Sequence, residues 1–273
     1  MNSHTKTIHY CWFGRNSLPE EANKCIESWK RYCPDYEIKE WNESNFDFSI
    51  CNYAKEAYEA KKWAFVSDYA RFWILYNYGG IYFDTDVELI KPIDDLIEKG
   101  PFMGGEPSGK NTYRIAAGLG LYVGSQHPIY KDILNHYKTL KFRISDGVYN
   151  DETIVTYITD IARKYGFKGN GDIETFEGIT VYPPEYFCPM NVNTGELNIT
   201  NNTRSIHWYS ALWKDQREAE IHRNSIQLYN KMPNTVGKCV SIIYENISKT
   251  IYYAQKEGIN NTMRRIARKT RKL

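Results

Sequence analysis

The sequence lacks any apolar run long enough to cross a membrane as a helix, which takes about 20 residues. Its first residues, MNSHTKTIHYCWFG, contain no apolar core of the kind that a secretory signal carries. We therefore expect a cytoplasmic protein without a spanning helix.

Cysteines are few, and their spacing is uninformative for metal binding. The six cysteines include no Cys-x-x-Cys pair and no framework spacing, so structural zinc and a disulfide scaffold are both disfavoured. The sequence also has no His-x-His pair and no second aspartate-rich motif, one of which two-metal phosphoryl chemistry would need. A reducing compartment agrees with this pattern.

Segments with strand and helix patterns alternate through most of the 273 residues. We expect strands at 7–14, 36–41, 81–90, 116–123 and 179–182, and helices at 19–33, 53–62, 63–78, 93–97, 128–140 and 152–165. The glycine-rich segment 102–110 lacks Walker spacing and is expected to be a mobile active-site loop. The alternation predicts an α/β sandwich with a mostly parallel sheet. We expect one catalytic domain at 1–231 and a helical basic tail at 232–273.

Two aspartates, Asp84 and Asp86, are the strongest chemical signal in the chain. From residue 81 to residue 90 apolar and polar residues alternate strictly, which predicts a half-buried strand with both carboxylates on its polar face. Carboxylates two residues apart on a strand lie only about 7 Å apart at Cα and repel each other unless a cation lies between them. Oxygen ligands favour Mg²⁺, Mn²⁺ or Ca²⁺ over zinc. The alternative is an acidic strand edge in contact with water.

The helix expected before this strand carries a charged pair on an otherwise apolar surface. Residues 63–78 are apolar nearly all round, which is typical of a buried helix. Asp68 and Arg71 are three residues apart and share one face, so they either form a structural ion pair or line a cleft. Gly79 and Gly80 should end the helix and turn the chain sharply into the aspartate strand.

The motifs Ser-Asp-x-x-Arg, Gly-Gly-x-Tyr and Asp-x-Asp together resemble the sugar-binding Asp-x-Asp region of glycosyltransferase family 32. That family contains retaining transferases, among them yeast outer-chain mannosyltransferases and bacterial capsule enzymes, and it is similar to the glucosylating domain of the large clostridial toxins. The matching residues are Ser67, Asp68, Arg71, Gly79, Gly80, Tyr82, Asp84 and Asp86. The resemblance is strong over roughly the first half of the chain. It implies a single Rossmann-like nucleotide-sugar-binding domain of the glycosyltransferase A type.

Two further residues are predicted to contact the donor from their place in the chain. Trp12 lies at the end of the first expected strand, where doubly wound folds bind nucleotides, and could stack on a base or simply fill the core. Gly118 lies inside an expected strand, which indicates a close approach to the backbone, by a sugar ring or by a packed helix.

The resemblance also assigns roles to residues that spacing alone would not single out. It implies that His207 is a metal or phosphate ligand beside Asp84 and Asp86, and that Trp213 contacts the donor phosphates. Ser67 and Tyr82 are then expected in the donor site.

These residues predict a metal-dependent glycosyltransferase. The resemblance implies that a hexose, galactose or glucose, moves from a UDP-sugar with retention to a glycan, which we expect to be lipid-linked in capsule or O-antigen synthesis. Asp86 would bind Mn²⁺ or Mg²⁺ with the diphosphate, Asp84 would contact the ribose or sugar, and Asp68 and Arg71 would orient sugar hydroxyls. The alternatives are a non-catalytic Ca²⁺-dependent sugar-binding module and metal-dependent phosphoryl chemistry on nucleotide sugars.

Charge is distributed unevenly behind a net value of +2. Residues 232–273 contain nine Lys or Arg against two Glu, a net charge of +7, which leaves −5 on the rest of the chain. Apolar residues recur there at helical spacing, and six basic residues follow at 264–272. The tail is either an ordinary C-terminal helix with a solvated basic tip or a peripheral contact with the anionic inner face of the cytoplasmic membrane.

Overall fold

The computed structural model describes residues 6–145, 148–150, 152–192, 194–210, 216–232, 234–259, 261–263 and 266–267. The chain forms two compact units, which are described separately. The first consists of Met1–Met190 and Asn198–Tyr209, and the second of Asn191–Leu197 and Ser210–Leu273. The functional boundary expected between residues 231 and 232 stays a prediction.

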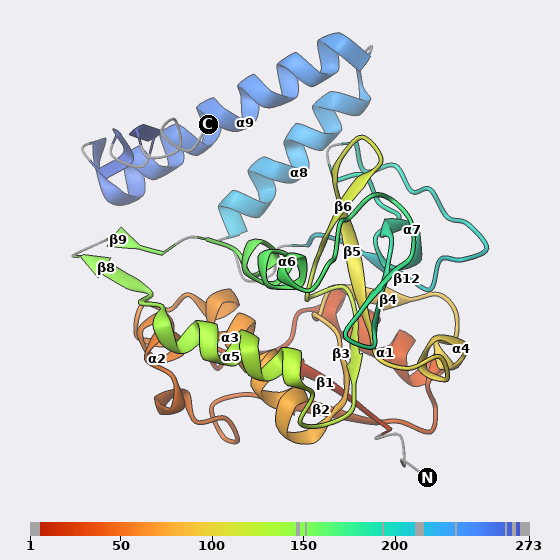
Figure 1. Ribbon diagram of the computed structural model, residues 1–273. Coiled ribbons are helices and arrows are strands. Elements are labelled where there is room, and N and C mark those ends of the chain that lie inside the picture. The colour runs from red at the N-terminus through yellow and green to blue at the C-terminus, as the bar shows by residue number, and fades with distance from the viewer. Residues whose placement is uncertain are drawn as a thin grey trace. The chain divides into compact units, whose positions relative to one another are not determined.

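The elements of the described residues are labelled in Figure 1. The strands are β1 (Thr7–Cys11), β2 (Glu37–Trp41), β3 (Gly80–Tyr82), β4 (Val87–Leu89), β5 (Phe102–Gly109), β6 (Thr112–Ile115), β7 (Leu121–Val123), β8 (Arg143–Ser145), β9 (Val148–Tyr149), β10 (Glu174–Phe176), β11 (Ile179–Tyr182) and β12 (Ser205–His207). The helices are α1 (Glu20–Tyr32), η1 (Phe48–Ile50, a 3₁₀ turn), α2 (Asn52–Glu59), α3 (Trp63–Tyr78), α4 (Asp94–Ile97), α5 (Pro128–Thr139), α6 (Ile154–Lys164), α7 (Pro184–Phe187), α8 (Gln216–Asn230) and α9 (Asn234–Glu257).

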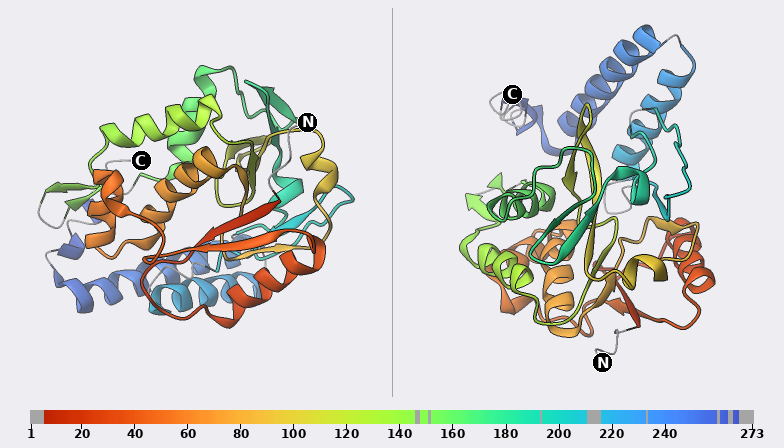
Figure 2. Two further views of the ribbon diagram at one scale, coloured as in Figure 1. Left: turned by 90° about the horizontal axis from the view of Figure 1, so that it is seen from below. Right: turned by 45° about the vertical axis from the view of Figure 1, so that its right-hand side comes forward.

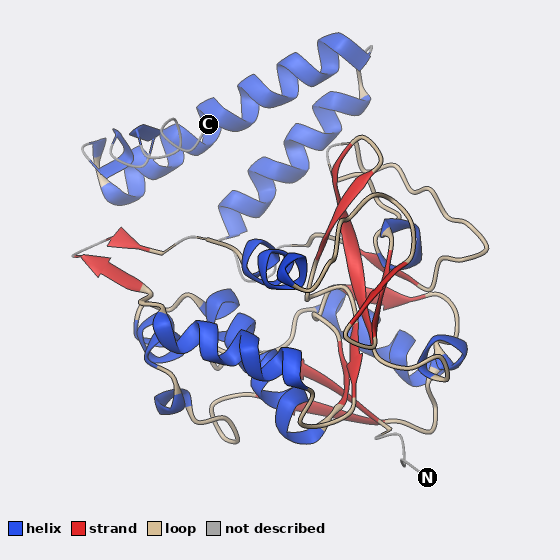
Figure 3. Cartoon of the chain, viewed as in Figure 1, coloured by secondary structure: helices blue, strands red, loops and turns tan. Residues whose placement is uncertain are grey.

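One large sheet organises the first unit (Figure 3). Its strands lie in the order β10-β11-β5-β7-β3-β1-β2. Strands β2, β1, β3, β5 and β11 point the same way, whereas β7 and β10 run against them. The prediction of an α/β fold with a mostly parallel sheet is confirmed.

Alternate residues of the central strands supply two separate cores, one on each face of the sheet. In β1, Ile8 and Tyr10 belong to one buried cluster and Cys11 to the other; in β3, Ile81 and Tyr82 divide in the same way. Helix α1 packs on one side of these strands and α2 and α3 on the other (Figure 2). Near-continuous apolar strands such as β1 are typical of a sheet that is covered on both faces.

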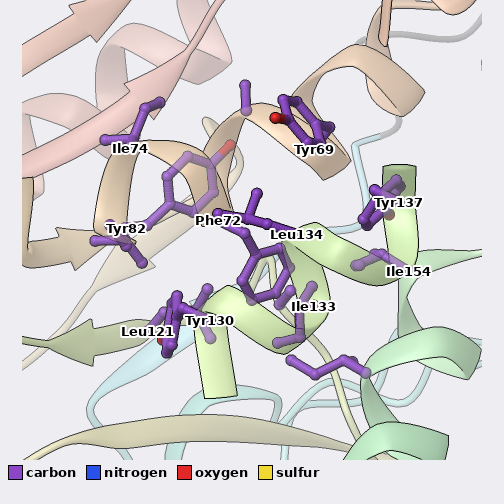
Figure 4. Packing of buried hydrophobic residues seen from close by; sticks show 14 of the residues in the cluster. Tyr69, Phe72, Ile74, Tyr82, Leu121, Tyr130, Ile133, Leu134, Tyr137 and Ile154 are labelled. Carbon is purple, nitrogen blue, oxygen red and sulfur yellow. The ribbon is translucent and has the colours of Figure 1, made fainter. Parts of the chain in front are cut away.

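Helix α3 is buried because aromatic side chains surround it, as its nearly all-round apolar sequence predicts. Phe72 packs against Tyr130 of α5 with ring centroids 5.3 Å apart, and Tyr69 packs against Tyr137 at 5.7 Å. Figure 4 shows these rings together with Tyr82 from the neighbouring strand β3. A helix held on several sides in this way can present charged side chains at a fixed place.

The single strand expected over residues 81–90 is wrong. The chain makes a turn at Asp84, whose carbonyl accepts a hydrogen bond from the Val87 N–H at 3.1 Å. Strand β3 before the turn belongs to the large sheet, whereas β4 after it pairs with β12. The burial of successive side chains still alternates through the turn, since Phe83, Thr85 and Val87 are buried. Periodicity therefore predicted the burial of each residue but not the break in the strand.

Two neighbouring expectations also need correction. The expected strand at 116–123 is confined to β7, and residues 116–120 form the connection from β6. Segment 102–110 is not a mobile loop but strand β5, paired with β11, β7 and β6. A Cβ at Gly105 would lie 2.4 Å from the Tyr113 ring. The glycines of β5 therefore allow aromatic packing rather than mobility.

His9 of β1 ties three elements together while remaining neutral. The Trp41 indole N–H, which can only donate, donates to His9 Nδ1 at 3.1 Å. His9 Nε2 must then carry the proton, and it donates to the Gly79 carbonyl at 3.0 Å. Burial lowers the pKa of His9 to about 4. This histidine is structural and fixes the turn that leads into β3.

The second unit is built around α8 and α9, which pack against each other. Among the described residues, no helix combines the length and the apolar character needed to cross a membrane.

Acidification should destabilise the protein through His9. Burial lowers the pKa of His9 from its ordinary value of 6.5 in the unfolded chain to about 4 in the folded protein. The unfolded state alone therefore binds this proton at intermediate pH, and stability that is complete above pH 6.5 is lost as the pH falls toward 4. This group alone should lower the free energy of unfolding by about 2 kcal/mol between about pH 7.5 and pH 5. Guanidinium denaturation at both pH values should show a smaller loss in His9→Gln, and an equal loss would contradict this assignment.

Candidate active site

Three parallel strands end at one edge of the sheet, and two of the predicted site residues, Trp12 and Asp84, lie directly beyond them. Trp12 follows β1, Asn42 follows β2, and Asp84 lies just beyond β3. Ligands of open α/β sheets bind outside the carboxyl ends of the strands. The fold therefore brings Trp12 and the Asp-x-Asp turn to the edge where such ligands bind.

A surface pocket of about 350 Å³ opens beside Trp12. Its walls are Trp12, Arg15, Asn16, Glu40, Asn42, Glu43 and Ser44. The Trp12 indole N–H donates to the Asn16 carbonyl at 2.8 Å, which fixes the orientation of the ring. An aromatic face among amide and carboxylate groups can bind a flat, polar ring by stacking and hydrogen bonding.

Arg71 lies at the centre of a buried cluster and has several partners. Its Nη2 is 3.1 Å from Asp68 Oδ1, its Nη1 is 3.3 Å from Asp84 Oδ2, and its Nε donates to the Ser67 carbonyl at 3.0 Å. Its side chain is only 4 % exposed and stacks on the Tyr82 ring at 4.9 Å. Burial raises the pKa of Asp68, and the Arg71 guanidinium opposes that rise.

Tyr82 and Gly118 complete the support of Asp84. The Tyr82 hydroxyl donates to Asp84 Oδ1 at 3.0 Å, and the Gly118 carbonyl accepts from the Asp84 N–H at 2.9 Å. A Cβ at Gly118 would lie 1.9 Å from Asp84 Oδ2. The close approach that the sequence predicted at Gly118 is thus made by the Asp84 carboxylate. The Asp84 side chain is still 29 % exposed. Its carboxylate is therefore held by neighbouring residues and remains partly open to solvent.

Asp86 is paired with the histidine that the resemblance implied. Pairing of β12 with β4 sets His207 opposite Val87, and His207 Nε2 lies 3.2 Å from Asp86 Oδ1. Burial lowers the pKa of His207, but the carboxylates of Asp86, Asp84 and Glu106 outweigh burial and raise it above its usual value. His207 Nδ1 is buried and has no hydrogen-bond partner among the described residues.

Glu106 is not among the site residues that the sequence predicts. This carboxylate projects from β5, pairs with Arg114 at 3.1 Å and is 19 % exposed. Burial raises its pKa, while the charges of Arg114 and His207 oppose the rise. We expected a mobile loop at 102–110, and a residue on a mobile loop has no fixed neighbours. Glu106 therefore had no predicted role. Glu106 is, with Asp86 and Asp84, one of three carboxylates whose charges raise the pKa of His207.

The donor atoms suit a hard divalent cation. Asp84 and Asp86 supply carboxylate oxygens, and the 3.2 Å between Asp86 Oδ1 and His207 Nε2 is close to the spacing of adjacent ligands that lie about 2.1 Å from one octahedral ion. Among the described residues no group of three or more His, Cys, Asp or Glu side chains is arranged to hold a metal. A cation here would therefore need further oxygens from a ligand, as Mg²⁺ commonly takes from phosphates.

Trp213, the remaining predicted donor contact, lies outside the described residues. The direct sugar contacts predicted for Asp68, Arg71 and Ser67 stay predictions. In the structure Arg71 contacts both the Ser67 carbonyl and the Asp68 carboxylate, and the Ser67 hydroxyl donates to the Trp63 carbonyl.

Known proteins are similar in sequence to this part of the chain. The family model "glycosyltransferase sugar-binding region containing DXD motif" matches residues 19–103, less than a third of the chain. Inositol phosphoceramide mannosyltransferase 1 of Schizosaccharomyces pombe is 29 % identical over 130 residues, which cover 43 % of this chain and 39 % of that protein. Inositol phosphoceramide mannosyltransferase 3 of the same yeast is 30 % identical over 100 residues, 34 % of this chain and 27 % of that protein. The chain thus matches less than half the length of either relative.

Solved glycosyltransferases align along more of the chain at lower identity. A glycosyltransferase involved in the glycosylation of the major capsid of PBCV-1 aligns with a TM-score of 0.44 and 16 % identity, covering 79 % of this chain and 98 % of that one. The galactosyltransferase LgtC aligns with a TM-score of 0.40 and 15 % identity, covering 84 % and 98 %.

The family match includes the Ser-Asp-x-x-Arg, Gly-Gly-x-Tyr and Asp-x-Asp motifs on which the predicted resemblance rested. That prediction is confirmed, because residues 19–103 match the model of glycosyltransferase sugar-binding regions that contain an Asp-x-Asp motif.

Proposed function

We propose that this chain is a glycosyltransferase that moves a hexose from a nucleotide-diphosphate sugar to a glycan acceptor. The observation that carries the proposal is the position of the Asp-x-Asp turn and the Trp12 pocket beyond strands β3 and β1, which are paired in parallel. A base against Trp12 and a diphosphate at Asp86 would then lie along one edge of the sheet. The family match over residues 19–103 supports the same activity.

The residues of the site have different proposed roles in binding and in chemistry. A divalent cation, Mn²⁺ or Mg²⁺, would neutralise charge on the departing diphosphate. Asp86 and His207 would hold it, and Asp84 would orient the donor. Arg71, which is almost fully buried, would act by fixing Asp84. Preorganised charges of this kind stabilise a transition state because they need not reorganise during the reaction.

We further propose retention by front-face displacement. The bond between the anomeric carbon and the diphosphate oxygen breaks, and a bond from the acceptor hydroxyl oxygen forms on the same face. The hydroxyl proton passes to an oxygen of the leaving phosphate. The retaining outcome rests on the family resemblance. The partly exposed carboxylate of Asp84 is already bound by Arg71 and Tyr82.

UDP-galactose or UDP-glucose is the first choice of donor, and a lipid-linked glycan of capsule or O-antigen synthesis the first choice of acceptor. The two yeast relatives are named as mannosyltransferases, which makes GDP-mannose the second candidate donor. Mass-detected hydrolysis of a panel of UDP- and GDP-sugars with Mn²⁺, and with Ca²⁺ or chelator as controls, tests the proposal. Release of a nucleoside diphosphate from one donor, lost with chelator, is expected. Binding without turnover of any donor would favour a sugar-binding module instead.

Asp86→Ala should abolish metal-dependent turnover without unfolding the protein. The substitution removes a proposed ligand and the partner of His207, but it also relieves repulsion between neighbouring carboxylates, so the fall in stability should be small. Donor hydrolysis should drop about a hundredfold or more, measured beside Glu88→Gln, a change at a partly exposed carboxylate two residues along the chain. Normal turnover by Asp86→Ala with Mn²⁺ would show that the metal is bound elsewhere.

Trp12→Ala should weaken donor affinity more than turnover. Stacking on the base is the same in the ground state and the transition state, so its loss raises KM and leaves kcat nearly unchanged. A loss of about 1–3 kcal/mol in donor binding is expected for one stacked base. Titration calorimetry with the nucleoside diphosphate measures it. A fall in kcat at unchanged affinity would contradict the stacking role.

Gly118→Ala should reduce activity by moving Asp84. The new methyl group would overlap the Asp84 carboxylate, which must then leave Arg71 and Tyr82. Gly124→Ala is the matched control, because a Cβ there meets nothing within 4 Å. We expect kcat to fall about tenfold or more in Gly118→Ala and to stay normal in Gly124→Ala. Equal activity in both variants would mean that the position of Asp84 is unimportant.

A further inference from the structure

Helix α9 exposes an apolar face to solvent. Val236, Ile243, Ile247 and Ile251 are 52 %, 57 %, 55 % and 53 % exposed. Their spacing of seven, four and four residues puts them along one side of the helix. We call these four residues the α9 stripe.

The opposite side of α9 is polar and packs against α8. Glu245 accepts hydrogen bonds from His222 Nδ1 at 3.2 Å and Ser225 Oγ at 3.1 Å, and Lys249 pairs with the same carboxylate. The hydrogen bond from His222 and the hydrogen bond and charge of Lys249 lower the pKa of Glu245 to about 2. A surface helix normally turns its apolar side inward. Helix α9 does the reverse, so its sequence is adapted to a second, apolar surface.

The charge of this part of the chain identifies that surface. Residues 232–273 carry a net charge of +7, although the whole chain carries only +2. If a second copy covered the stripe, two strongly basic segments would be brought together and would repel each other. An anionic lipid surface attracts the basic residues and accepts the isoleucines, as it does for interfacial amphipathic helices.

We propose that the α9 stripe inserts into the interfacial layer of an anionic lipid membrane. The basic residues at 264–272, which lie outside the described residues, would add attraction to lipid headgroups. This proposal is independent of the catalytic one, because it depends on a different part of the chain and is read out without donor or acceptor.

A fluorophore on Cys239 reports directly on the stripe. Cys239 lies three residues after Val236 and four before Ile243, on the same side of α9. It is exposed, whereas the other five cysteines are buried, so an environment-sensitive thiol label should attach there selectively. We expect a blue shift when the full chain meets vesicles of phosphatidylcholine with phosphatidylglycerol, a weaker one with phosphatidylcholine alone, and weakening at high salt. An unchanged spectrum with anionic vesicles would overturn the proposal.

Matched variants distinguish membrane binding through the α9 stripe from non-specific binding through exposed isoleucines. The triple substitution Ile243→Ser, Ile247→Ser and Ile251→Ser should reduce cosedimentation with anionic vesicles about tenfold or more. The control is Ile144→Ser, Ile173→Ser and Ile199→Ser, at isoleucines that are 64 %, 50 % and 52 % exposed in the first unit, and it should sediment as the wild type does. Equal vesicle binding by both triple variants would overturn the proposal. So would a blue shift that rises with protein concentration in the absence of lipid, since a second copy would then cover the stripe.

Discussion

The buried guanidinium of Arg71 is the interaction on which the site depends. It joins the α3 carboxylate of Asp68 to the turn carboxylate of Asp84 from inside the core, where its side chain is only 4 % exposed. A charge buried in this way is stable only while its partners are in place, and removal of one partner from such a pair typically costs about 3–5 kcal/mol. Packing of α3 and the position of the Asp-x-Asp turn are therefore coupled.

Three neighbouring parts of the chain support the Asp-x-Asp turn, while the Asp84 side chain stays 29 % exposed. Tyr82 supports Asp84 from β3, Gly118 leaves room for its carboxylate, and His207 approaches Asp86 from β12. Such preorganisation suits chemistry in which charge develops on a leaving diphosphate, because the ligands need not move when the charge appears. In the proposed mechanism, Arg71 acts through this rigidity by fixing Asp84.

Local patterns in the sequence predicted much of this arrangement. Helix α3 was expected at its observed bounds because its residues are apolar nearly all round, and the two glycines marked the turn into β3. Local patterns could not show that the chain breaks at Asp84, because β4 leaves the large sheet to pair with β12, which lies far along the chain. Glu106 was missed for a similar reason, since only the pairing of β5 with β6 brings Arg114 beside it. The His207 prediction came from family resemblance, and no spacing in the sequence would have selected it.

The central claim is that Trp12 and the Asp-x-Asp turn bind two ends of one ligand. A crystal structure with Mn²⁺ and the nucleoside diphosphate of the preferred donor, collected at the manganese absorption edge, tests it most directly. The account predicts an anomalous peak within bonding distance of Asp86, with phosphate oxygens on the same ion and the base against Trp12. A nucleotide bound elsewhere, or a manganese ion that contacts neither Asp84 nor Asp86, would contradict it.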